Sequence, residues 1–158
     1  MLESLYAYFD SLPALYETFL RTVEFSQLGD LARRSVWLYP AANTLHVLGA
    51  ALLVGAILVY DIRILRGREP TKTALTLSII GLSLLLVTGP TMFSAEATAI
   101  GHNPIFQLKM AIILAALINV LLHWIAGSAL PRLARLHAVI SGLLWTAALI
   151  FGRLIAYF

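Results

Sequence analysis

Residues 37–65 of the chain read WLYPAANTLHVLGAALLVGAILVYDIRIL. No Asp, Glu, Lys or Arg interrupts this stretch before position 61. A helix that crosses a bilayer needs about 20 consecutive, mostly apolar residues, so the stretch predicts a membrane-spanning helix over 38–61. Three further apolar stretches of similar length follow, over 74–94, 105–125 and 136–157. The sequence therefore predicts an all-α integral membrane protein whose residues 36–158 form a four-helix bundle.

The composition excludes most other classes of protein. Of the 158 residues, 60% are hydrophobic and 12% are charged, whereas a soluble domain carries about 25% charged residues. So little charge excludes an ordinary soluble enzyme, and so much apolar surface excludes intrinsic disorder. The net charge is only +3 and the basic residues lie in short clusters between apolar runs, which argues against a nucleic-acid partner. The absence of cysteine excludes disulfides, thiolate metal sites, iron–sulfur clusters and c-type haem attachment.

The loops predict an orientation in the bilayer. The second connection, over 95–104, contains no Lys or Arg, whereas the first and third contain six: Arg63, Arg66, Arg68, Lys72, Arg132 and Arg135. Basic loops favour the cytoplasmic side, so both termini and the second connection are expected in the periplasm of a bacterium, with the chain in the inner membrane. Aromatic residues lie near the span ends, as expected of interfacial anchors: Trp37, Tyr39, Tyr60, Phe93, Trp124, Tyr157 and Phe158.

Residues 1–35 predict a periplasmic amphipathic helical segment. Repeated acidic residues exclude a cleavable signal peptide, while apolar residues recur at helical spacing at Leu2, Leu5, Tyr6, Phe9, Leu15, Tyr16, Phe19, Leu20 and Val23. Pro13 suits the first turn of a second short helix. The apolar face is expected either to lie on the membrane surface or to bind a protein partner. A homo-oligomer formed through this segment and through small-residue helix faces is also open.

Ionisable residues inside a membrane are candidates for function, and three lie at matched depth near the outer face: His46, Lys109 and Arg153. His46 is roughly 12 Å below the outer end of the first span at 1.5 Å per residue, and Asn43 shares its helical face. A pocket formed by these residues would suit a b-type haem, with His46 as the ligand of the iron. Lys109 and Arg153 would pair with the propionates. The alternative is a histidine bonded to a neighbouring helix, with both basic side chains extending to the interface.

The remaining histidines offer weaker sites. His123 and His137 lie at similar depth on the cytoplasmic side, so a second haem with two histidine ligands is conceivable, although headgroups would solvate these side chains equally well. His102 lies in the outer connection near Met92, and imidazole and thioether ligands suit copper. A solvated loop explains that grouping as well. No nucleophile–base pair and no phosphate-binding glycine loop is present, and whether the chain is an enzyme stays open.

Three stretches carry a resemblance to known proteins: residues 37–65, then NPIFQLKMAIILAALINVLLH from Asn103, and GRLIAYF from Gly152. Together they resemble a bacterial family of four-helix membrane proteins without an assigned activity, over about residues 35–158. More remotely, the chain is similar to the superfamily of CopD-type copper-resistance proteins and HemJ-type protoporphyrinogen oxidases.

The remote resemblance rests on a first-span His, a small-residue stripe and a following Arg, here His46, Gly49 and Arg63, and on a third-span Lys and His, here Lys109 and His123. It implies a haem ligand at His46 and a functional role for Lys109. Asp61 before Arg63 departs from the pattern, so protoporphyrinogen oxidation does not carry over.

These observations leave three functions. The first is a membrane protein that binds haem b and transfers electrons near the periplasmic face, alone or as a subunit of a larger complex. The second is a CopD-like protein that handles copper through His102, Met92 and His46. The third is a structural or assembly subunit without a cofactor, in which the polar residues join the helices.

Overall fold

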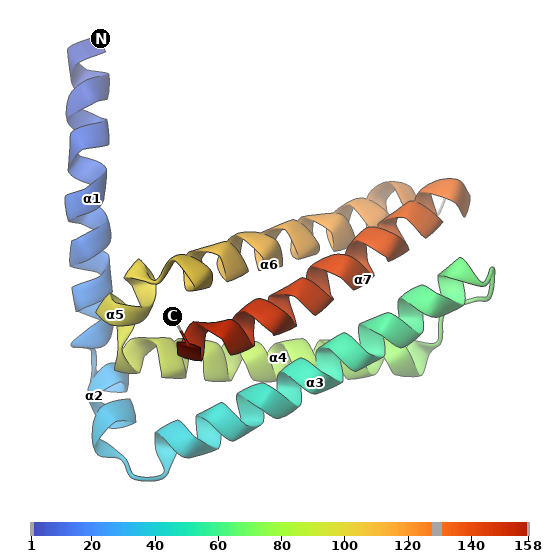
Figure 1. Cartoon of the computed structure of the whole chain (residues 1–158), viewed down its shortest axis with the longest axis horizontal. Helices are drawn as coiled ribbons and strands as arrows, with labels where there is room; N and C mark the ends of the chain where they lie inside the picture. Colours follow the sequence, from blue (N-terminus) through green and yellow to red (C-terminus); the bar gives the residue numbers. More distant parts are fainter. Residues whose placement is uncertain (1, 128–130, 158) are drawn as a thin grey trace.

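The computed structural model describes the backbone of residues 2–127 and 131–157, and the side chains of residues 13–125 and 131–157. These residues form seven α-helices and no strand (Figure 1). Four segments are long and apolar enough to cross a membrane: α3 (Leu38–Leu65), α4 (Lys72–Ala95), α6 with its last turn (Pro104–Ile125) and α7 with its last turn (Pro131–Tyr157). The predicted all-α bundle of four spans is confirmed, and the chain is a multi-pass membrane protein.

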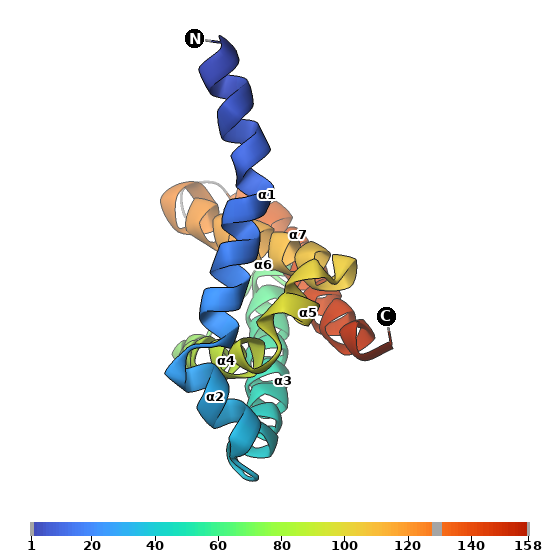
Figure 2. The same ribbon diagram turned by 90° about the vertical axis from the view of Figure 1, so that its left-hand side faces the viewer.

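The four spans pack in an open arrangement. α3 packs against α4 and α7, and α6 packs against α7, so the order around the bundle is α4, α3, α7, α6 (Figure 2). α4 and α6 meet at the α1 end, where the rings of Phe93 and Phe106 are stacked with centroids 5.3 Å apart. Leu53, Val54, Ala116 and Trp145 form the buried core. Large apolar side chains elsewhere on the spans are exposed, including Val87 and Leu143 at 70% and 68%, and lipid is the solvent that covers such a surface favourably.

Two glycines let α3 and α4 approach closely. A Cβ atom on Gly81 would lie 2.6 Å from the backbone nitrogen of Leu53 and 2.8 Å from the carbonyl oxygen of Gly49. Gly49 itself would meet the Leu84 side chain at 2.9 Å. Small residues at such a crossing let membrane helices gain van der Waals contact between their backbones. The predicted small-residue face on the first span therefore serves packing inside this chain.

The ends of the spans follow local capping rules. α4 begins at Lys72 because the side chain of Thr71 accepts a hydrogen bond from the Ala74 N–H at 3.3 Å. The side chain of Asn103 caps α6 in the same way. α7 begins at Pro131, five residues before the predicted start, because proline is favoured in the first helical turn. α6 ends in a π-helical turn, His123–Gly127, a geometry that is frequent at functional sites.

The N-terminal segment is helical as predicted, but its break lies elsewhere. α1 (Leu2–Glu24) continues through Pro13, and α2 (Gln27–Arg34) follows it. The prediction that Pro13 opens a second helix is therefore wrong. The chain bends instead at Ser26, whose hydroxyl oxygen accepts a hydrogen bond from the Gly29 N–H at 3.2 Å and so caps α2. The predicted apolar anchor Phe9 lies outside the residues whose side chains are described.

α1 crosses the end of the bundle at a steep angle to the spans, beside α2 and α5 (Ala97–His102) (Figures 1 and 2). Arg33 of α2 donates hydrogen bonds to the carbonyl oxygens of Glu24 and Ala95, at 2.6 and 3.2 Å. The carboxylate of Glu24 accepts a hydrogen bond from the Thr98 N–H at 2.7 Å. Leu20 of α1 is fully buried. The N-terminal helices are thus fixed to the end of the bundle where the second connection lies.

Candidate functional site

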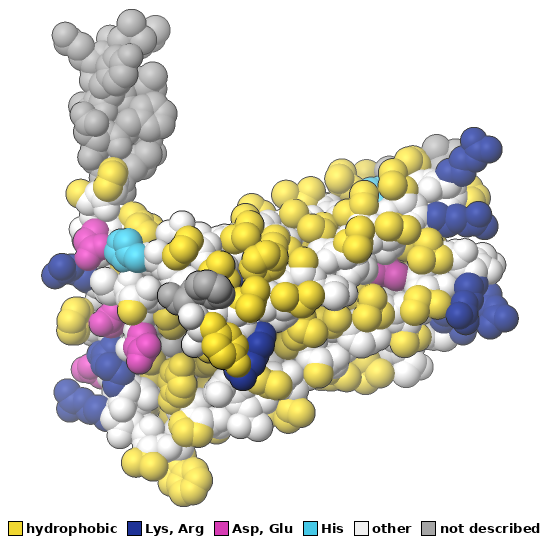
Figure 3. All heavy atoms as spheres, viewed as in Figure 1, with side chains coloured by type: hydrophobic (Ala, Val, Ile, Leu, Met, Phe, Trp, Pro, Cys, Tyr) yellow, Lys and Arg dark blue, Asp and Glu magenta, His cyan; other side chains and the backbone are white. Residues whose placement is uncertain are grey.

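Polar side chains enter the bundle at two depths, one in each half of α3. His46 lies near the α1 end, and Asp61 lies near the opposite end, where Arg and Lys side chains gather (Figure 3). The two residues are about 22 Å apart along the helix at 1.5 Å per residue. We call the first the His46 site and the second the Asp61 cavity.

The imidazole of His46 is held in one orientation by α4. Its Nδ1 lies 2.8 Å from Oγ1 of Thr88, and that hydroxyl lies 2.7 Å from the carbonyl oxygen of Leu84. Because Thr88 donates its only hydrogen to Leu84, its oxygen accepts the Nδ1 hydrogen of His46. Nε2 of His46 then keeps its lone pair. The ring lies over Gly89, where a Cβ would be in van der Waals contact with Cε1 of His46 at 3.4 Å.

Lys109 of α6 reaches the same end of the bundle. Its side chain is half-buried and lies over the α7 backbone at Gly152, where a Cβ would lie 3.3 Å from both Cε and Nζ of the lysine. Lys109 and His46 thus lie in the same half of the bundle, on α6 and α3. Among the described contacts, no hydrogen bond joins these two side chains that were predicted to share a pocket.

The other two predicted members of that pocket lie apart. Arg153 is exposed, and its guanidinium donates a hydrogen bond to the hydroxyl of Tyr157 at 3.2 Å and lies over the Tyr157 ring. Asn43 is exposed as well. Among the described contacts, neither side chain touches His46 or Lys109. The described contacts in this half of the bundle are those of His46 with Thr88 and Gly89, and that of Lys109 with Gly152.

His102 serves a contact between helices. Its Nδ1 lies 2.8 Å from the carbonyl oxygen of Thr98, its Nε2 lies 3.3 Å from the carboxylate of Glu17, and its ring meets Tyr16 edge-on. Both ring nitrogens thus have partners on α5 and α1. Met92 is half-buried in α4. Within the described part of the chain, no three His, Cys, Asp or Glu side chains gather as a metal site would require.

At the other end, the structure brings His123 and His137 together. Their ring centroids are 5.9 Å apart and the rings are edge-to-face. Asn119 donates a hydrogen bond from Nδ2 to the His137 carbonyl oxygen at 3.0 Å, and its Oδ1 lies 2.8 Å from Nδ1 of His137. Since the oxygen of the amide accepts, Nδ1 of His137 is the donor. Asn119 therefore joins α6 to α7 and orients this imidazole.

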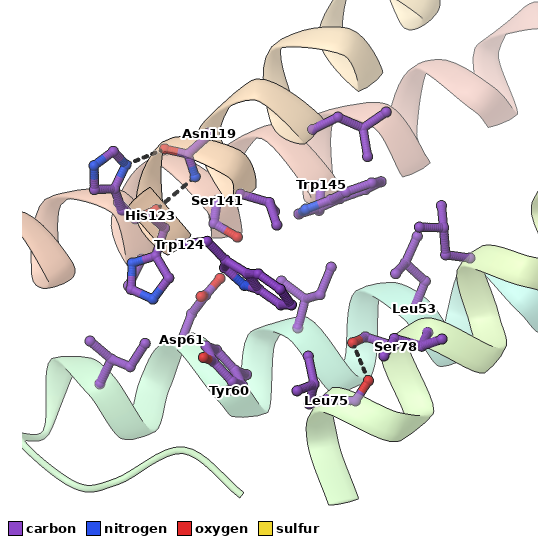
Figure 4. A pocket seen from close by; sticks show the side chains of 18 residues that line it. Leu53, Tyr60, Asp61, Leu75, Ser78, Asn119, His123, Trp124, Ser141 and Trp145 are labelled. Atoms are coloured by element: carbon purple, nitrogen blue, oxygen red, sulfur yellow. Dashed lines mark hydrogen bonds between the residues drawn. The ribbon is translucent and has the colours of Figure 1, made fainter. Parts of the chain in front are cut away.

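These residues border a cavity of about 210 Å³ lined by all four spans (Figure 4). Asp61 and Trp145 line it and are 5% and 4% exposed. The carboxyl group of Asp61 points toward the hydroxyl of Ser141 (Figure 4). Three buried atoms on the cavity wall have no hydrogen-bond partner among the described residues: Oδ2 of Asp61, Nδ1 of His123 and Nε1 of Trp145. The Asp61 cavity is thus an apolar chamber that contains unpaired polar atoms.

Sequence reasoning did not select Asp61, Asn119, Ser141 or Trp145 as site residues. The spacing of the polar residues in the sequence points to this cluster, because residues four apart share a helix face. Asn119 and His123 are four apart, as are Ser141 and its neighbours His137 and Trp145. Asp61 is an acidic residue at the end of an apolar span. Like His46, it is an ionisable residue within a membrane-spanning segment and therefore a candidate for function. What the sequence did not show is that these three helices turn the polar faces toward one another.

Comparison of the chain with protein-family models, with curated protein sequences and with solved structures gave no match.

Proposed function

We propose that this chain is a b-type haem-binding protein of the bacterial inner membrane that takes part in electron transfer near the periplasmic face. The observation that carries the proposal is the hydrogen bond between Nδ1 of His46 and Thr88, which leaves Nε2 of the imidazole free to bind iron. Histidine ligands of metals are held in this way, by a hydrogen bond from the second ring nitrogen that fixes the tautomer and the ring orientation.

The residues in this half of the bundle include a partner for the acidic groups of a haem. Lys109 supplies a cation on α6, as a haem propionate requires. When bound, the haem would supply a centre that gains and loses one electron. Of the chain's own residues, His46 would hold the iron and Lys109 would pair with a propionate.

The orientation that we propose follows the basic residues. The basic side chains of the first and third connections lie at the end of the bundle away from α1, whereas basic side chains at the α1 end are mixed with acidic ones (Figure 3). The positive-inside rule therefore favours the cytoplasmic side for the end away from α1. The His46 site and both termini then lie toward the periplasm. α1 runs across the bundle end, where an amphipathic helix meets the membrane surface or a protein partner.

Two other functions make different use of the same residues. Copper handling needs His102, but its two ring nitrogens already have partners on Thr98 and Glu17. A cofactor-free subunit would use the contact between His46 and Thr88 only to join α3 to α4. The haem assignment is preferred over that alternative because the contact with Thr88 leaves Nε2 of His46 without a hydrogen-bond partner in the described structure, and because Lys109 supplies a second polar group in the same half of the bundle.

The test is the visible spectrum of the purified protein after supplementation with haem b. The wild type is expected to show a Soret band, and His46→Ala should abolish it. Thr88→Val removes the partner of Nδ1 and should weaken haem affinity by about 10–100-fold, as is usual for such partners of metal ligands. His102→Ala is the matched control and should keep the band. A well-folded wild type without a Soret band would refute the proposal, and a band that survives His46→Ala would reassign the ligand.

A further inference from the structure

The Asp61 cavity contains polar atoms that the described chain does not satisfy. Asp61 and Trp145 are more than nine-tenths buried, yet Oδ2 of the carboxyl group and Nε1 of the indole have no hydrogen-bond partner, and neither has Nδ1 of His123. In the interior of a membrane no bulk water compensates such groups. An occupant that forms hydrogen bonds with them would stabilise this arrangement.

The other side chains of the cavity wall indicate the polarity and the size of the ligand. Apolar side chains such as Leu53, Ile57 and Leu82 line most of it, together with the rings of Tyr60 and Trp124. The volume of about 210 Å³ is below the range of about 300–1,000 Å³ that is usual for sites of drug-sized ligands. A single six-membered ring with small apolar substituents matches this volume.

The cavity reaches the lipid-facing surface between α4 and α6. Ile79 of α4 and Leu117 of α6 both line the cavity and are exposed, as is Trp124. The described contact between these two helices is the stacking of Phe93 on Phe106 at the other end of the bundle, with ring centroids 5.3 Å apart. The wall on this side is therefore made by single side chains, and a ligand with a long apolar tail would enter here with its tail remaining in the bilayer.

We infer that the Asp61 cavity binds the ring of a lipid-soluble hydroquinone, with one ring oxygen at Asp61 and the other at Trp145. A phenolic hydroxyl both donates and accepts, so it pairs with a carboxyl group, and the second ring oxygen accepts from the indole N–H. An organic ammonium ion would pair with Asp61 but has no acceptor for Trp145. A ring that is apolar, neutral and oxygenated at both ends satisfies both groups.

The probe for this site is trimethylhydroquinone, titrated calorimetrically into the full-length protein in detergent. Its dimethyl ether keeps the ring but has no hydrogen to donate. We expect saturable binding of the hydroquinone, at least tenfold tighter than that of the ether. Asp61→Leu and Trp145→Phe should each weaken hydroquinone binding about tenfold or more, since each removes a buried hydrogen-bonding group. Ser94→Ala, which removes a buried hydroxyl at the other end of α4, is the matched control and should bind as the wild type does.

Leu82→Trp gives an independent result, because it fills the cavity from α4 and leaves the polar groups in place; it should abolish binding. The inference is overturned by a wild type that does not bind the hydroquinone saturably, by equal affinities for the hydroquinone and the ether, or by preferred binding of a benzylammonium ion. It does not rest on the haem proposal, since His46 lies in the other half of the bundle and a haem titration reports on that half alone.

Discussion

Single glycines determine how closely the first two spans approach. Gly81 of α4 faces the backbone of α3, where a Cβ would lie 2.6 Å from Leu53 N. Backbone atoms within a helix cannot move aside as a flexible side chain does. The contact between α3 and α4, which carries both His46 and Thr88, therefore depends on the absence of one methyl group.

We predict that Gly81→Ala lowers the stability of the bundle by about 1–3 kcal/mol, the usual effect of overpacking a well-packed contact. The matched control is Gly55→Ala on α3, because a Cβ at that position meets nothing within 4 Å. Thermal unfolding in detergent, followed by helical circular dichroism, measures the difference. Equal midpoints for Gly81→Ala and the wild type would show that the two helices do not approach as closely as described.

Among the elements, α1 depends most on polar contacts for its position. Glu24 at its end is bound to Thr98 of α5. Hydrogen bonding by Thr98, through its hydroxyl and its backbone N–H, holds the pKa of Glu24 below its ordinary value of 4.5. A carboxyl group whose pKa is lowered by folding stabilises the folded form above that ordinary value, and the stabilisation is lost as the pH falls through the lowered pKa.

We therefore predict that the contact between α1 and α5 loosens as the pH falls below the ordinary pKa of Glu24. Spin labels on cysteines introduced at Thr18 and Ala99, both exposed, would report the distance between the two helices. The distance distribution should broaden as the pH falls from 6 to 3. Glu24→Gln should be broader already at pH 6 and lose part of the pH dependence, since the contact of His102 with Glu17 also joins α5 to α1, whereas Glu69→Gln at the far end should match the wild type. A wild-type distribution that does not change with pH would contradict this account.

The helices also show which features of the fold can be predicted from the sequence. The four spans were predicted from apolar length alone, because lipid requires that length irrespective of tertiary contacts. The predicted ends of the helices were less accurate. α7 begins at Pro131 rather than at 136, and α1 continues through Pro13. Both differences concern proline, which is compatible with either a helix start or a tolerated interior position. Capping by Ser26, which depends on a side-chain conformation, fixes where α2 begins.

At the scale of the whole molecule, the two ends of the bundle differ in charge and in chemistry. The far end carries the basic residues of the first and third connections and the Asp61 cavity, whereas the α1 end carries the His46 site and a mixture of acidic and basic side chains, among them Glu24 and Arg33 (Figures 1 and 3). The sequence predicted the depth of His46 and Lys109, since depth follows from position along a span. It did not predict that Arg153 turns toward Tyr157 or that Asp61 faces Ser141, because rotation about the helix axis depends on how the four spans pack.

The proposed orientation predicts which loops are accessible from outside the cell. The chain lacks cysteine, so single cysteines at the exposed positions Arg66 and Ala99 are the only targets of a thiol reagent. In intact cells, a membrane-impermeant maleimide should label position 99 and leave position 66 unlabelled until the membrane is permeabilised. Labelling of position 66 alone in intact cells would invert the orientation.

The number of haem b molecules bound per chain tests the central claim most directly. His46 is assigned to the haem, and the histidines His123 and His137 belong to the cavity at the other end. A titration of the purified protein with haem b, followed at the Soret band, should saturate at one equivalent in the wild type and in His123→Ala, and should show no specific binding in His46→Ala. Saturation at two equivalents, or one equivalent that persists in His46→Ala and is lost in His123→Ala, would contradict the assignment.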